Sequence, residues 1–141
     1  MERRPTRSHG DRGLEWFSAI VMIGWALVLI QPGDTIGGGN LRELLRHGLT
    51  EQDVSAVFGL AGGARVAALF INGRWPRTPI VRMIGATAGF VLWSQIALFL
   101  YAGPALANGA MSTGVAVYLP LALADLFSIF RAAYDVRYQR R

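Results

Sequence analysis

The arginines of this chain fall into three clusters, and long apolar stretches separate the clusters. All 14 basic residues are arginine, and 11 of them lie in these clusters. Each apolar stretch between successive clusters has room for two membrane-length segments. Because basic residues gather on the cytoplasmic side of membrane proteins, the pattern predicts four crossings with both termini in the cytoplasm. The clusters are Arg3, Arg4, Arg7 and Arg12; Arg74, Arg77 and Arg82; and Arg131, Arg137, Arg140 and Arg141.

Composition favours a membrane protein over a soluble one. The chain has 141 residues, enough for one domain, and 52% of them are hydrophobic. Only 16% are charged, against about 25% in a typical soluble domain. The net charge of +5 could indicate a nucleic-acid partner, but the arginines border apolar segments and line no polar face. The sequence therefore predicts an all-α integral membrane protein that does not bind nucleic acid.

Turn residues and charges divide the chain into two basic tails and four apolar spans. Residues 1–13 and 132–141 are the predicted cytoplasmic tails, and residues 14–131 are the predicted transmembrane domain. The sequence of the second tail, AAYDVRYQRR, allows the last helix to extend into the cytoplasm. A span of about 17 residues rises roughly 25 Å as a helix, which is short but sufficient for a thin bilayer. The predicted transmembrane helices are 14–30, 54–71, 79–101 and 110–131.

The first span and the basic link before the third carry residues typical of a membrane interface. Glu15 lies at the cytoplasmic end of the first span, where its carboxylate can reach headgroups and water. Trp16 and Trp75 are predicted interface anchors, because tryptophan favours the headgroup level. Basic residues before an apolar run also precede cleaved signal peptides. No small-residue cleavage site follows Ile30, which favours an uncleaved first helix.

The first outer link contains a second helical pattern. In LRELLRHGL the leucines recur at helical spacing with charged residues between them, which predicts a short amphipathic helix on the outer membrane face. Thr50 to Asp53 has the spacing of a capping box, here with aspartate in the fourth place, just before the second span.

Arg65 and Asp125 are the strongly charged residues deep inside predicted spans. Arg65 precedes the inner end of its helix, Ile71, by six residues, and Asp125 precedes Arg131 by six. Both helices run from outside to inside, so both groups lie about 9 Å from the same face. The matched depth predicts an intramembrane ion pair with a structural role. Two alternatives stay open: Arg65 snorkels to the inner headgroups, or the two residues form a proton or ion path.

Two glycine patterns predict close helix packing. Gly59 and Gly63 are four residues apart in the second span, and Gly85 and Gly89 in the third. Such spacing leaves a groove into which another helix can fit. We expect these glycines to pack the helices of one chain together.

The chain offers little to catalysis or metal binding. It has no cysteine, its two histidines are solitary, and its serines have no histidine partner in the pattern. We therefore expect neither an enzyme, a metal site nor a cofactor.

The stretch AALFINGRWPRTPIVRMIGATAGFVLWSQIAL and the terminal FRAAYDVRYQRR resemble small multi-helix membrane proteins encoded by tailed bacteriophages and prophages. The resemblance extends over about residues 60–141 in pattern. Several such proteins are regarded as holin-like. The resemblance implies a viral protein that accumulates in the bacterial inner membrane and then assembles suddenly into lesions that release a lytic enzyme.

Two further function classes stay open. One is an accessory subunit of a larger membrane or virion complex, or a superinfection-exclusion factor. The other is a small transporter or channel that uses Arg65 and Asp125. The predicted partners are the lipid bilayer and either further copies of the chain or a larger protein complex.

Overall fold

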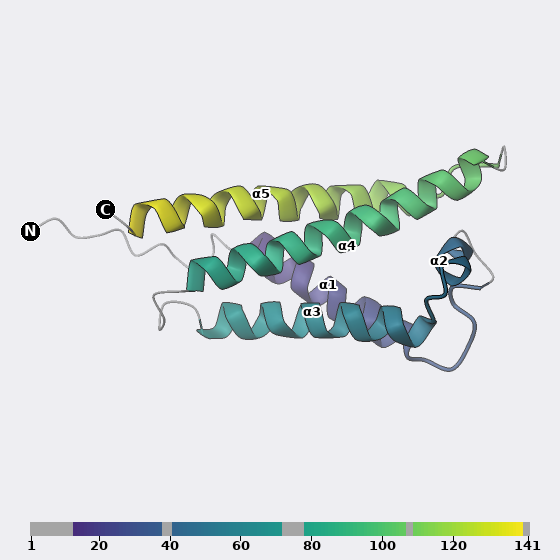
Figure 1. Cartoon of the computed structure of the whole chain (residues 1–141), viewed down its shortest axis with the longest axis horizontal. Helices are drawn as coiled ribbons and strands as arrows, with labels where there is room; N and C mark the ends of the chain where they lie inside the picture. The colour runs from purple at the N-terminus through teal and green to yellow at the C-terminus, as the bar shows by residue number, and fades with distance from the viewer. Residues whose placement is uncertain (1–12, 38–40, 72–77, 107–108, 140–141) are drawn as a thin grey trace, which may run out of the picture.

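The chain forms an all-helical bundle, seen here in a computed structural model (Figure 1). Four long helices pack against one another, and a single helical turn lies between the first two of them along the chain. The structure describes residues 13–37, 41–71, 78–106 and 109–139.

The four long helices alternate in direction along the bundle. The helices α1 and α4 begin, and α3 and α5 end, at one end of the molecule, whereas α2 lies at the opposite end (Figure 1). This alternation is what short links between successive spans require. The helices are α1 (Gly13–Leu29), α2 (Arg42–Arg46), α3 (Glu51–Ile71), α4 (Thr78–Leu106) and α5 (Val115–Gln139).

The length and surface of these helices are those of a membrane-embedded bundle. Among the described residues, three helices are long and apolar enough to cross a membrane, namely α3, α4 and α5, and α1 is a shorter apolar helix of 17 residues. Large apolar side chains cover the outward faces, which a soluble monomer rarely allows. Examples from the four long helices are Ile20, Leu60, Phe70, Ile84 and Phe130.

The predicted end of the third span is wrong. We expected this helix to cover 79–101, but α4 continues through Pro104 to Leu106. Proline keeps a helical φ and forfeits one backbone hydrogen bond, and α4 ends two residues after it. The end is closed instead by Gly109, whose N–H donates to the carbonyl of Pro104 over 2.8 Å.

The predicted start of the fourth span is also wrong, whereas the helix continues into the tail, as the sequence allows. We expected 110–131, whereas α5 begins five residues later and runs eight residues further. The delay comes from a turn in which Ser112 Oγ accepts from the N–H of Gly114 over 3.3 Å. The extension follows because no glycine or proline interrupts the residues after Arg131. The stretch predicted as a basic tail is therefore mostly helix.

The amphipathic helix of the outer link is shorter than its leucine pattern suggests. It is a single turn, α2, with Leu44 buried and Leu49 42% exposed. Gly48 adopts a φ of 79° directly after this turn, a left-handed conformation that turns the chain away before Leu49 can pack.

The capping box before α3 forms as predicted. The N–H of Thr50 donates to Asp53 Oδ2 over 2.9 Å, and the N–H of Asp53 donates to Thr50 Oγ1 over 3.1 Å. These reciprocal bonds satisfy backbone donors that a helix start leaves free. They explain why the helix predicted for 54–71 already begins at Glu51.

Candidate functional site

Arg65 on α3 and Asp125 on α5 meet inside the bundle. Arg65 Nη2 lies 2.6 Å from Asp125 Oδ1, and Arg65 Nη1 lies 2.8 Å from Asp125 Oδ2. The side chains are 5% and 0% exposed. This two-pronged geometry gives a guanidinium and a carboxylate their strongest contact. The structure thus brings together the two residues that the sequence placed at one depth, and Arg65 does not snorkel to the headgroups.

Two further helices contribute to the same cluster. Ser18 Oγ on α1 donates to Asp125 Oδ2 over 2.9 Å and accepts from Arg65 Nη1 over 3.0 Å. Trp93 Nε1 on α4 donates to Ser18 Oγ over 3.2 Å. We call Ser18, Arg65, Trp93 and Asp125 the polar node. It takes one side chain from each long helix, so it fixes all four helices against one another.

The glycines of α4 make room for the polar node. A Cβ at Gly85 would lie 2.9 Å from Arg65 Cγ, and one at Gly89 would overlap both the Asp125 carboxylate and the Arg65 guanidinium. We expected Gly85 and Gly89 to receive a neighbouring helix. They receive the Arg65 side chain and its partner instead.

Of the two glycines of α3 that we expected to pack against another helix, Gly59 does so among the described residues and Gly63 does not. A Cβ added at Gly59 would lie 3.5 Å from the Ala26 Cβ on α1, whereas one added at Gly63 would meet no atom of another helix in the described part of the chain within 4 Å. The close approach occurs at Gly62, where an added Cβ would lie 3.1 Å from the backbone oxygen of Ala19. The contact between α1 and α3 therefore uses positions three residues apart, a spacing that also shares one helix face.

Glu15 and Arg82 form a second buried ion pair, which the sequence analysis missed. Arg82 Nε on α4 donates to Glu15 Oε2 on α1 over 2.8 Å, and Arg82 Nη2 pairs with Glu15 Oε1. Both side chains are buried, so Glu15 does not reach headgroups as we expected. Depth counting could have found the pair, because both residues lie in the first two turns of helices that run the same way.

An aromatic layer adjoins the polar node and again draws on every long helix. Its members are Trp25, Phe58, Trp93 and Tyr118, from α1, α3, α4 and α5. Trp93 and Tyr118 stack at 5.6 Å, and Phe58 lies 5.0 Å from Trp93. Trp25 Nε1 donates to Tyr118 Oη over 2.8 Å, which satisfies two polar atoms inside an apolar layer.

Of the two predicted interface anchors, the structure describes Trp16. Trp16 lies edge-on against Phe70 of α3, with ring centroids 5.0 Å apart, near the end where α1 begins. Trp75 lies outside the described residues.

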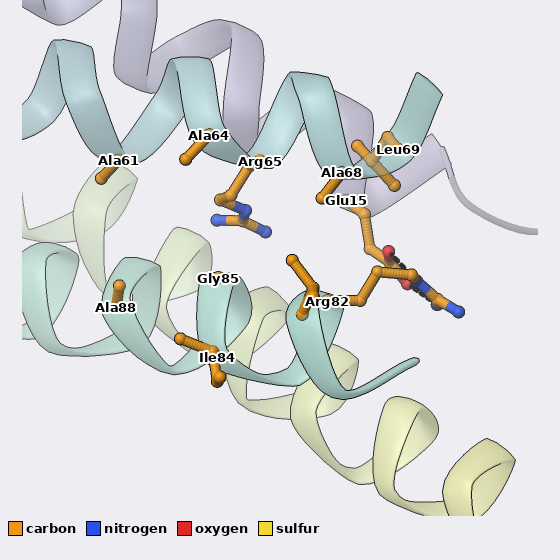
Figure 2. A pocket seen from close by; sticks show the side chains of 11 residues that line it. Glu15, Ala61, Ala64, Arg65, Ala68, Leu69, Arg82, Ile84, Gly85 and Ala88 are labelled. Carbon is orange, nitrogen blue, oxygen red and sulfur yellow. Dashed lines mark hydrogen bonds and ion pairs between the residues drawn. The ribbon is translucent and has the colours of Figure 1, made fainter. Parts of the chain in front are cut away.

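A cavity of about 170 Å³ separates α3 from α4 next to both ion pairs. Arg65 extends from α3 toward Gly85, whereas Arg82 turns aside to Glu15 (Figure 2). Small residues line most of the remaining wall, so α3 and α4 are not in tight contact here. These residues are Ala61, Ala64, Ala68, Gly85 and Ala88.

The chemistry of the polar node is that of a structural joint. Asp125 is fully buried, and both of its oxygens already accept hydrogen bonds. Among the described residues, every buried side-chain nitrogen and oxygen has a partner. A lone charge at the centre of a membrane helix costs about 2.5–3.5 kcal/mol, and pairing offsets much of that cost.

No protein-family model matches the chain, and no curated protein or solved structure matches it either. Function is therefore inferred from the polar node, the outward faces and the direction of the helices.

Proposed function

We propose that this chain is a four-span protein of the bacterial inner membrane that acts by helix packing and self-assembly, in the manner of holins. The supporting observation is how its polar groups are distributed. The charged side chains deep in the bundle bind one another, and the outward faces are apolar. The apolar surface of such a molecule contacts lipid and other copies of the chain. Its buried polar side chains bind one another and hold its helices together.

The direction of the helices supports a topology with both termini in the cytoplasm. The start of α1, the end of α3, the start of α4 and the end of α5 lie at the same end of the bundle (Figure 1). In the sequence, the three arginine clusters lie at or next to these helix ends. An orientation with this end of the bundle in the cytoplasm therefore agrees with the positive-inside rule.

The test is induced expression in a bacterium, with growth and membrane potential followed together. If the proposal is right, growth stops abruptly after a period of accumulation, and a potential-sensitive dye reports collapse at the same moment. An inert four-span protein expressed to the same level in the membrane is the control. Full viability with the protein in the membrane contradicts the proposal and favours an accessory role in a larger complex.

A further inference from the structure

The bundle consists of two helical pairs that pack more closely within themselves than against each other. The first pair is α1 with α3, and the second is α4 with α5. Contacts of α3 with α4, and of α1 with α4 or α5, are less extensive. Inside the first pair, Gly62 lets the helix backbones approach closely. Between the pairs, by contrast, lies the cavity between α3 and α4.

The joint between the two helical pairs is rich in polar contacts. Both buried ion pairs cross it, since Glu15 and Arg65 belong to the first pair and Arg82 and Asp125 to the second. The hydrogen bonds from Trp25 to Tyr118 and from Trp93 to Ser18 cross it as well. Each helical pair therefore presents one cation and one anion that match the other pair.

A separated helical pair cannot turn these charges toward lipid, because an unpaired charge in the bilayer is costly. Apolar burial contributes little to helix association in lipid, where packing and hydrogen bonds decide which helices bind. The complementary surface that satisfies a separated pair is present on every other copy of the chain.

We infer that copies of this chain assemble by exchanging helical pairs, with α1 and α3 of one copy packed on α4 and α5 of the next. Arg65 of one copy then binds Asp125 of another. Each copy has one surface of each kind, so two copies close a dimer and several close a ring. This inference rests on the proposed function, for which it supplies the contacts of assembly.

Charge reversal in separate copies tests the exchange. One tagged copy carries Arg65→Asp and the other carries Asp125→Arg, so each alone sets like charges against one another. If pairs exchange, coexpression restores the accumulation that each variant loses alone, and the two tags purify together. The double variant R65D/D125R in one chain is the control for folding of the reversed pair. A stable double variant without rescue by coexpression overturns the inference.

Cysteine cross-linking gives a second readout, since the natural chain has no cysteine. Ala61 on α3 and Ala88 on α4 line the same cavity. When one copy carries Ala61→Cys and another carries Ala88→Cys, the two cysteines face the same cavity only after exchange. We expect a cross-linked dimer from this combination and none from the outward-facing control, Leu60→Cys with Phe130→Cys. Cross-linking confined to single chains that carry both A61C and A88C overturns the inference. Neither readout depends on lysis, so cross-linked dimers in fully viable cells would refute the proposed function and leave pair exchange standing.

Discussion

At the scale of single residues, Ser18 has a larger role than its small side chain suggests. It is fully buried and bonds to three partners on three other helices. Removal of the hydroxyl takes the Ser18 acceptor from the buried Trp93 Nε1 and one hydrogen bond each from Arg65 and Asp125, which still bind one another.

We expect Ser18→Ala to destabilise the bundle by roughly 1–3 kcal/mol, the cost of buried polar groups that lose a partner. The measurement is unfolding in detergent, followed by circular dichroism. Ser128→Ala is the matched control, because Ser128 is also buried and its hydroxyl donates to the carbonyl of Ala124 in its own helix. Equal losses for the two variants would contradict the special role of Ser18.

The ion pair itself predicts an asymmetry between single and double substitutions. Asp125→Asn or Arg65→Gln leaves one buried charge unmatched and should cost about 3–5 kcal/mol. The double variant R65M/D125L removes both charges and should cost much less than the sum. A double-mutant cycle in detergent measures the difference. Additive losses would show that the two residues act independently.

Some of these buried polar contacts could be predicted from the sequence. Counting residues from the inner helix ends set Arg65 and Asp125 at one depth, and the structure brings them together. Arg82 belongs to the second arginine cluster, whose position predicts the cytoplasmic side, and this assignment hides its place inside a helix. Ser18 and Trp93 were beyond prediction, because hydropathy does not fix how far each helix is rotated about its axis.

At the scale of helices, neighbouring glycines of α3 have opposite surroundings. Gly62 faces α1 closely, whereas a Cβ added at Gly63 would meet no atom of another described helix within 4 Å. Gly62→Val should force α1 and α3 apart and cost about 1–3 kcal/mol, as overpacking does. Gly63→Val should leave the unfolding transition almost unchanged. Similar effects of the two variants on detergent unfolding would refute the close contact at Gly62.

The four long helices could be predicted, but the end of α4 and the start of α5 could not. Apolar length identifies each span, but the point where a helix begins or stops depends on local hydrogen bonds. The closure at Gly109 decides the end of α4 and the turn at Ser112 decides the start of α5, and neither follows from hydropathy. The capping box at Thr50 was predictable because its spacing is itself a hydrogen-bonding pattern.

At the scale of the whole molecule, the proposed topology predicts which positions a membrane-impermeant thiol reagent reaches. Thr35→Cys and Thr113→Cys lie near the end of the bundle proposed to face outward, and both positions are exposed. They should react in intact spheroplasts. Gly13→Cys, exposed at the opposite end, should react only after permeabilisation. Labelling of all three positions from the same side would contradict a membrane-spanning bundle in this orientation.

The polar node also has a consequence for the time course of biosynthesis. Asp125 follows Arg65 by 60 residues, so at about 5–20 residues per second the ribosome adds the carboxylate roughly 3–12 s after the guanidinium. During that interval the nascent chain holds a cation whose counter-charge does not yet exist. A chain cut short before α5 keeps that defect within its own bundle. The node therefore makes stable insertion conditional on complete translation, and truncated products should be cleared by membrane proteases.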